Sequence, residues 1–218
     1  MALGTRRSDG APRMVSMSLI QLGPAELVAL IVGTSFAAGL NVYATVATLG
    51  LLARFEATTL PPELALLASW WVIGAAGVMF LIEFLADKVP AVDLVWNALH
   101  TFVRVPAGAL LAYAAATPLS PGWQLSAAVL GGLIALAAHG AKMAARAAVT
   151  PSPEPLSNMG LSLAEDAVAI LLTWFATNHP FIAAGIVAVM LVAIIMLIRW
   201  VWLALRALFR GAGRVAAG

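Results

Sequence analysis

Four polar side chains recur within one apolar segment at intervals that place them on a single helical face. They are Asp93, Asn97, His100 and Arg104, spaced by four, three and four residues. If the helix enters a bilayer near Asp93, a rise of 1.5 Å per residue puts Arg104 about 16 Å deep, near the midplane. An ionised side chain there costs from about 3 to more than about 10 kcal/mol unless it is paired or hydrated. Arg104 is therefore either a site for an anionic group or half of a structural ion pair.

Carboxylates flank this segment in two other apolar stretches. Glu83 and Asp87 are four residues apart, so both can face the same neighbouring helix, and they are the nearest counter-charges for Arg104. Glu165 and Asp166 are adjacent and point about 100° apart on a helix, so they cannot both face the same partner. One of these two acids is expected to complete an interior site while the other pairs with a cation.

Two further features interrupt apolar segments. Lys142 and Arg146 share a helical face with His139, and for these two cations extension of the side chain to the cytoplasmic headgroups is favoured over an interior position. Asn41 follows Gly39 in the first segment. It indicates either a partly unwound stretch lining a cavity or a hydrogen bond between close-packed helices.

The composition predicts an integral membrane protein built of helices. Among its 218 residues, 62% are hydrophobic, 10% are charged, and the mean hydropathy is +0.98. Soluble domains are roughly 45–50% apolar and about 25% charged, so water could not solvate a fold of this chain. Cysteine is absent, which excludes disulfides, thiolate metal sites and cysteine nucleophiles. The formal charge of +2 does not indicate nucleic-acid binding, because the basic residues lie at segment ends.

Breaks by proline, glycine and charge divide the chain into apolar segments of about the length of a membrane span. We predict an all-α, polytopic transmembrane helix bundle with about six spans, at about 24–53, 63–86, 94–116, 122–148, 159–177 and 180–208. Residues 1–18 are predicted to be a disordered cytoplasmic tail rather than a cleaved signal, 19–210 a single transmembrane domain, and 211–218 a C-terminal tail.

The distribution of lysine and arginine predicts the orientation, since cytoplasmic loops carry the excess of these residues. With both termini in the cytoplasm, the opposite side receives only Arg54. The cytoplasmic side receives Arg6, Arg7, Arg13, Lys88, Lys142, Arg146, Arg206, Arg210 and Arg214. We therefore expect a multi-pass protein of the cell inner membrane with cytoplasmic N- and C-termini.

The two halves of the chain are candidates for an inverted repeat. Residues 23–116 and 120–208 each contain three predicted spans, and their first spans begin with similar glycine or serine and proline pairs. An odd number of spans inverts the second half relative to the first, as in many secondary transporters, whose sites lie where the repeats meet.

Several ordered motifs resemble a bacterial family, the domain of unknown function 4126. They are the run from Glu83 to Asp93, Thr101 to Ala109, His139 to Lys142 and Ser157 to Asp166. The resemblance covers about residues 23–205 and implies a multi-spanning membrane protein, without a substrate or reaction. Asn97 stands where similar sequences are expected to carry an acid.

Three functions fit these observations. The first is a small transporter or channel for an anionic or small polar solute, coupled to protons through the buried acids, with site residues Asn41, Glu83, Asp87, Asp93, Asn97, His100, Arg104, Lys142, Glu165 and Asp166. The second is a non-catalytic scaffold or assembly protein. The third is an intramembrane enzyme acting on lipid phosphates, although dense acidic metal motifs and nucleophile-elbow patterns are absent from the sequence. No cofactor and no metal is expected; the lipid bilayer is the expected partner, and a homo-oligomer is compatible with all three.

Overall fold

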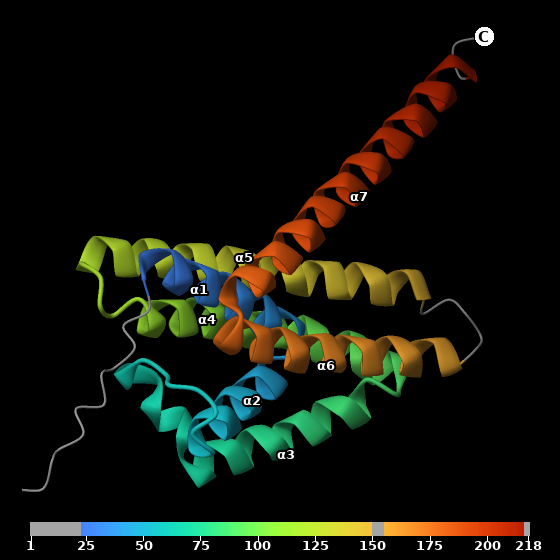
Figure 1. The fold of residues 1–218 in the computed structure, drawn as a ribbon. Coiled ribbons are helices and arrows are strands. Elements are labelled where there is room, and N and C mark those ends of the chain that lie inside the picture. Colours follow the sequence, from blue (N-terminus) through green and yellow to red (C-terminus); the bar gives the residue numbers. More distant parts are fainter. Residues whose placement is uncertain (1–22, 150–154, 216–218) are drawn as a thin grey trace, which may run out of the picture.

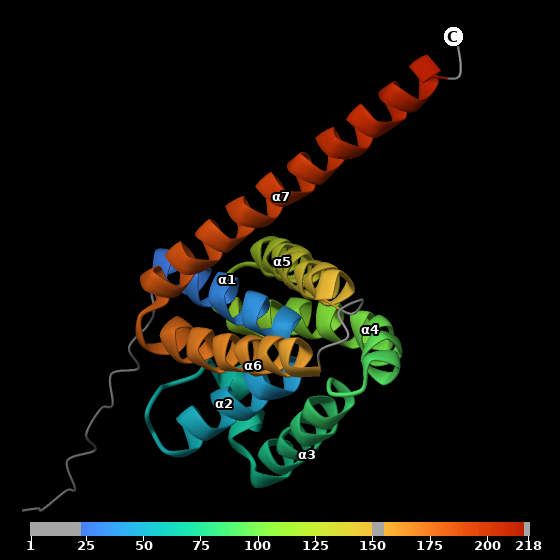
Figure 2. The same cartoon turned by 90° about the vertical axis from the view of Figure 1, so that its right-hand side faces the viewer.

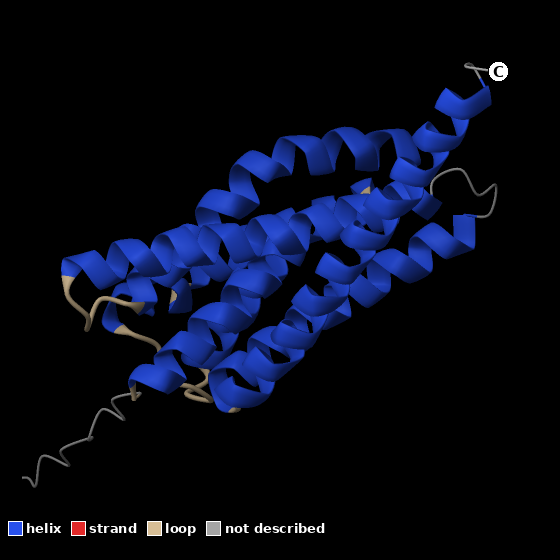
Figure 3. Cartoon of the chain, turned by 90° about the horizontal axis from the view of Figure 1, so that it is seen from above, coloured by secondary structure: helices blue, strands red, loops and turns tan. Residues whose placement is uncertain are grey.

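The fold consists of helices wrapped around a short central one (Figure 1). The computed structural model describes residues 23–149 and 155–215. The elements are α1 (Pro24–Leu40), α2 (Val42–Arg54), the 3-10 helix η1 (Pro62–Ala68), α3 (Trp70–Ala86), α4 (Pro90–Ala115), α5 (Pro121–Val149), α6 (Pro155–Asn178) and α7 (Pro180–Val215). All described regular structure is helical (Figure 3), which agrees with the all-α prediction.

Helix α1 is the centre of the bundle. It packs against α4, α5, α6 and α7, and twelve of its seventeen residues are buried. Small residues permit this approach: a Cβ on Gly39 would lie 2.8 Å from Ala138 Cβ on α5. Close backbone contact of this kind replaces the large apolar core of a soluble protein, as expected for helices that associate in lipid.

The first predicted span is not one helix. The chain breaks at Asn41, which has an extended backbone (φ −150°, ψ 103°) and divides the segment into α1 and α2. The side chain of Asn41 causes the restart, because its Oδ1 accepts a hydrogen bond from the Ala44 amide at 2.9 Å and so caps α2. At 17 and 13 residues, both pieces are shorter than a full crossing of about 20 residues.

The second predicted span is bent. Residues 62–68 form η1, which meets α3 at an angle of 66°, with Ser69 capping α3 at the corner through the Val72 amide. Four described helices are long and apolar enough to cross a membrane, within α4, α5, α6 and α7, and η1 with α3 makes a fifth if the bent pair is one span. The first half of the chain thus contains a broken and a bent segment, whereas the second half contains three continuous helices.

The outer surface is apolar, and the interior combines apolar clusters with buried polar residues. Large apolar side chains are exposed along α3, α4, α5 and α7, including Phe102, Trp71, Leu133 and Trp200. Helix α7 leaves the bundle and projects well beyond it (Figure 2). Among the described residues, seventeen polar or charged ones are buried beside the apolar clusters. Apolar helices with this distribution indicate a multi-pass membrane protein.

Candidate functional site

Arg104 lies fully buried in α4 and contacts partners from three helices. Its Nη2 donates to Glu83 Oε1 of α3 at 2.5 Å, and its Nη1 contacts Asn97 Oδ1 of α4 at 2.9 Å and His139 Nδ1 of α5 at 2.8 Å. Glu83 is fully buried as well. The arginine expected at the midplane is therefore paired, and the pair links α3 to α4.

The contacts of His139 fix its tautomer. Arginine can only donate, so His139 Nδ1 accepts from Arg104 and carries no proton. The proton of the neutral ring is on Nε2, which donates to Thr101 Oγ1 at 2.8 Å. The Thr101 hydroxyl in turn faces the Asn97 carbonyl at 3.4 Å. His139 is thus a neutral acceptor for Arg104 and adds no positive charge to the interior.

Lys142 of α5 lies one turn from His139 and bridges three carboxylates. Its Nζ lies 3.2 Å from Glu83 Oε1, 3.6 Å from Asp87 Oδ2 and 3.4 Å from Glu165 Oε2, and it faces the Leu40 carbonyl at 3.4 Å. Its side chain has no exposed surface. Lys142 thereby joins α3, α6 and the end of α1.

Arg146 is the third buried cation and lies one turn further along α5. It contacts Asp87 Oδ2 at 2.7 Å, Glu165 Oε2 at 2.6 Å and Asp93 Oδ1 at 3.2 Å. The prediction that Lys142 and Arg146 extend to the headgroups is wrong. Both point inward because four acids on neighbouring helices surround the α5 face that they share.

Asp87 lies in the turn between α3 and α4 and is fully buried, so it is no solvated turn residue. Burial alone would raise its pKa, but Lys142 and Arg146 outweigh that effect and hold the pKa below its usual value. A hydrogen bond from Ser162 Oγ to Asp87 Oδ2 at 3.1 Å acts in the same direction. Asp87 is therefore an ionised anchor for α5.

Asn41 connects the helix break to α6. Its Nδ2 donates to Asp166 Oδ1 at 2.8 Å while its Oδ1 caps α2. Asn41 is fully buried and Asp166 is 4% exposed. Of the two readings of Asn41, the structure shows both the interrupted helix and a hydrogen bond between helices.

The network leaves hydrogen-bonding capacity unused. Among the described residues, four buried atoms of this centre have no hydrogen-bond partner: Glu83 Oε2, Asp87 Oδ1, Arg104 Nε and Asp166 Oδ2. The charges do not balance either. Five carboxylates (Glu83, Asp87, Asp93, Glu165 and Asp166) surround three cations (Arg104, Lys142 and Arg146). Buried polar atoms normally find partners, so these four atoms and the two excess carboxylates distinguish the centre from an ordinary set of buried ion pairs.

A small cavity reaches this centre from the side of Arg146. It has a volume of about 20 Å³ and is lined in part by Asp93, Asn97 and Met143. That volume suffices for one water molecule, and the lining supplies the polar partners that a buried water needs. In the described ranges 23–149 and 155–215, no three histidine or acidic side chains are arranged to hold a metal ion.

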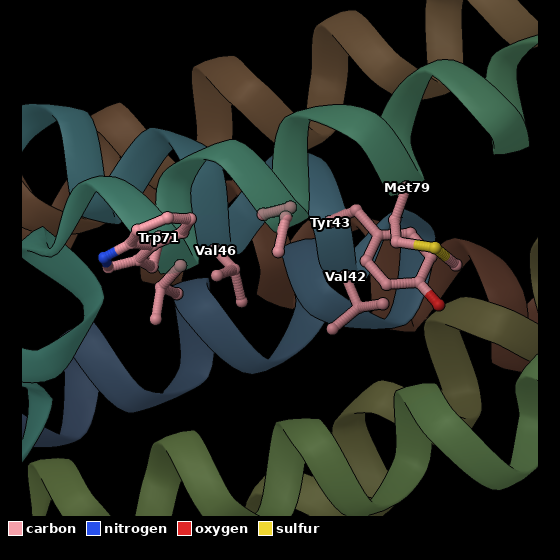
Figure 4. Close-up of a pocket in the computed structure, with 8 residues that line it drawn as sticks. Val42, Tyr43, Val46, Trp71 and Met79 are labelled. Atoms are coloured by element: carbon pink, nitrogen blue, oxygen red, sulfur yellow. The ribbon is translucent and has the colours of Figure 1, made fainter.

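A larger groove lies outside the network, between α2 and α3 (Figure 4). It has a volume of about 400 Å³ and an almost wholly apolar lining, with Trp71 at one end and Tyr43 beside Met79 at the other. The Tyr43 hydroxyl lies 3.0 Å from His100 Nε2, and His100 Nδ1 faces the Trp96 carbonyl at 2.7 Å. Tyr43 therefore lines the groove and also bonds to His100 of α4.

The profile of one family, Domain of unknown function (DUF4126), matches residues 28–200. The chain belongs to this family. The match includes all ten residues predicted for the site and ends within α7. No curated protein and no solved structure matches the chain.

In this DUF4126 protein, the ten predicted residues are all buried, and nine of them contact another member of the set or one of the three cations. Asp93 and Asn97 join each other as well, since Asn97 Nδ2 donates to Asp93 Oδ1 at 2.6 Å. His100 is the exception, because its ring stacks on Trp96 and bonds to Tyr43.

Sequence reasoning left four participants out of the predicted site: Thr101, His139, Arg146 and Ser162. For His139 and Arg146 the signal was present, since their spacing with Lys142 is three and four residues along one face. Thr101 and Ser162 carry no such signal, because hydroxyl residues are common in apolar helices and bond to their own backbone.

Proposed function

We propose that this protein is a membrane transporter for a small anionic solute, coupled to protons, and that the buried network is its binding and coupling centre. One observation carries the proposal: three cations and five carboxylates meet in the interior, at a helix break, with polar atoms left unpaired. Ionisable residues inside a membrane domain are costly and usually mark a path for ions, protons or solutes.

The cations supply the affinity for an anion. Arg104 keeps a free Nε, and Lys142 and Arg146 each contact several carboxylates at once. Protonation of one or more of these acids would leave positive charge available for a solute. The surplus of carboxylates therefore supports the coupling of anion binding to proton binding.

The broken and bent helices supply the movement. The Asn41 break and the corner at Ser69 lie in the first half of the chain and adjoin the network through Asp166 and α3. Interrupted helices at a central site are typical of secondary transporters. We also propose that the chain crosses the membrane six times, with α1 and α2 together forming one crossing and η1 and α3 another. The two halves are then related by inversion. The protein lies in the inner membrane with both termini in the cytoplasm.

A scaffold is the second candidate, and the density of pairing favours it. Arg146 alone contacts three carboxylates, and Lys142 contacts three through a single ammonium. A network of this kind could serve only to fix five helices in register. Under that function, no solute would move and neutralising Arg104 would change stability alone.

A flux assay distinguishes the two. Purified protein in liposomes is tested for uptake of labelled phosphate, sulfate, chloride, lactate and succinate, with and without a pH gradient. We expect one anion to be carried, with at least about tenfold slower uptake by Arg104→Gln, since that residue loses its charge at the site. The matched control is Arg199→Gln, an exposed arginine on α7. If no anion moves, or if a folded Arg104→Gln protein carries it at the normal rate, the transport proposal is wrong.

A further inference from the structure

Asp166 differs from the other buried acids in what surrounds it. Glu83, Asp87, Asp93 and Glu165 each have a lysine or arginine nitrogen within 4.0 Å, whereas Asp166 has none among the described residues. Its single hydrogen-bond partner there is the amide of Asn41, at 2.8 Å on Oδ1. Its Oδ2 is buried and has no partner in the described part of the chain.

The elements packed against α6 add little charge at this point. Helix α5 contributes Lys142, which lies beyond ion-pair distance and is held by Glu83, Asp87 and Glu165. Residues Glu83 and Asp87 themselves face Asp166 as negative charges. Helices α1 and α2 contribute Asn41, a neutral side chain, and the described side chains of α7 form no ion pair with Asp166.

The helix ends at the break do not offset the missing positive charge near Asp166. The C-terminus of α1 and the N-terminus of α2 meet at Asn41, and their partial charges have opposite signs. The Ala44 amide at the start of α2 could attract a carboxylate, but it donates its hydrogen bond to Asn41 Oδ1. An ionised Asp166 would therefore be stabilised by one amide at a buried position, which is far less than a buried carboxylate requires.

We propose that Asp166 is the proton-binding residue of the centre, neutral in the conformation described and ionised when the break opens. This inference rests on the proposed function and assigns its coupling ion to one carboxyl group. The proton is held on Asp166 Oδ2, the oxygen without a partner, and it leaves to water when α2 moves. No bond other than O–H is formed or broken.

The Asn41 side chain makes this proton sensitive to helix position. One amide group holds Asp166 through Nδ2 and starts α2 through Oδ1, so a shift of α2 removes the one donor that Asp166 has among the described residues. Once ionised, Asp166 competes for Lys142 with Glu83 and Glu165. A lysine drawn to Asp166 is lost to an anionic solute, so proton and anion are expected to bind together and leave together.

Infrared difference spectroscopy of the full-length protein in detergent tests the assignment without a solute. We expect wild-type protein at neutral pH to show the C=O stretching band of a buried carboxylic acid, and Asp166→Asn to lose it. Glu63→Gln is the control, because Glu63 is an exposed carboxylate on η1 and lies outside the network. That variant is expected to keep the band. A wild-type spectrum without the band, or a band that persists in Asp166→Asn, overturns the proposal.

Asn41→Ser provides a second measurement that needs no change at Asp166. Serine can still cap α2 but is too short to reach Asp166, so the band is expected to move to higher wavenumber. A band unmoved in this variant overturns the assignment. So does a wild-type band that disappears when sodium replaces potassium, since Asp166 would then bind a sodium ion.

The outcome is independent of the flux assay. An Asp166 band in a protein that carries none of the five anions would leave the proton site standing and reject the transport function. Anion uptake driven by a pH gradient, with a band unaffected by Asp166→Asn, would keep the transport function and place the proton elsewhere.

Discussion

Arg146 Nη2 lies 2.7 Å from Asp87 Oδ2, an ion pair that joins the C-terminal half of α5 to the turn between α3 and α4. Both side chains are at least 96% buried. Removal of one member of such a pair leaves the other charge uncompensated, which typically costs about 3–5 kcal/mol. The pair therefore helps to fix the turn between α3 and α4 against α5.

Asp87→Asn is expected to lower the free energy of unfolding by about 3 kcal/mol, because Arg146 and Lys142 both lose a partner. Denaturant titration in detergent micelles measures the change. Lys88→Gln is the control at the next position, where the lysine is half-buried and bonds to the Phe84 carbonyl. Its loss is expected to stay below about 1 kcal/mol. Equal losses in the two variants would show that the buried ion pair of Asp87 contributes no more to the free energy of unfolding than the half-buried Lys88 does.

The Asp87 carboxyl also predicts a dependence on pH. Its pKa is lower in the folded than in the unfolded protein, so its contribution to stability is fully present above the usual pKa of 3.8. That contribution is lost as the pH falls below this value and through the lower folded pKa. In acid titrations of thermal stability, wild-type protein is expected to lose more than Asp87→Asn. Parallel curves for the two proteins would contradict the assignment of an ionised Asp87.

Exchanging the charges of Glu83 and Arg104 tests whether their contact is a simple pair. Arg104 also donates to Asn97 Oδ1 and His139 Nδ1, and a glutamate at position 104 cannot donate to either acceptor. The double variant Glu83→Arg with Arg104→Glu is therefore expected to remain at least about 2 kcal/mol less stable than wild type. Full recovery of stability in the double variant would mean that only the charge pair matters.

The glycine at position 131 predicts a difference between two substitutions. A Cβ there would lie 2.7 Å from the Gly108 carbonyl and 2.8 Å from Ser35 Oγ, so Gly131→Val forces α4, α5 and α1 apart. A loss of at least about 1–3 kcal/mol is expected from such overpacking. Gly77→Val is the control, because no atom lies within 4 Å of its added Cβ. Thermal unfolding of both proteins decides, and similar melting temperatures would contradict the packing of α5 on α4.

The sequence predicted the continuous helices α4 to α7 to within four residues at every end except the C-terminus of α7, which lies seven residues beyond the predicted 208. Long apolar runs flanked by proline have one favourable structure in lipid. The sequence left the division at Asn41 open, as one of two alternatives. A single asparagine in an apolar run is compatible with a continuous helix, and its effect depends on a partner 125 residues away, Asp166. Local patterns contain no information about such a contact.

The candidate site was predictable where depth alone makes a charge unfavourable, as for Arg104. For Arg146 the spacing indicated a shared face with Lys142, but the inward direction of its side chain was not predictable, because at a helix end extension to the headgroups is the usual outcome. Arg146 turns inward because Asp87, Asp93 and Glu165 converge on it from α4, α6 and the turn before α4. The inward direction of Arg146 therefore depends on the tertiary positions of α4, α6 and the turn before α4, which local sequence patterns do not contain.

Asn97 supplies the last prediction. Its Oδ1 accepts from Arg104 at 2.9 Å and its Nδ2 donates to Asp93 Oδ1 at 2.6 Å, so an amide suits both contacts. Asn97→Asp would keep the first contact and set two carboxylates against each other in the second. We expect a loss of about 1–3 kcal/mol, larger in alkaline than in acidic buffer, because a proton shared by the two acids relieves their repulsion. Asn97→Ser is the control, since it loses both contacts without adding a charge and should lose stability equally in both buffers. Denaturation of the two variants at both pH values makes the comparison, and an Asn97→Asp protein as stable as wild type in alkaline buffer would show that Asp93 is already neutral.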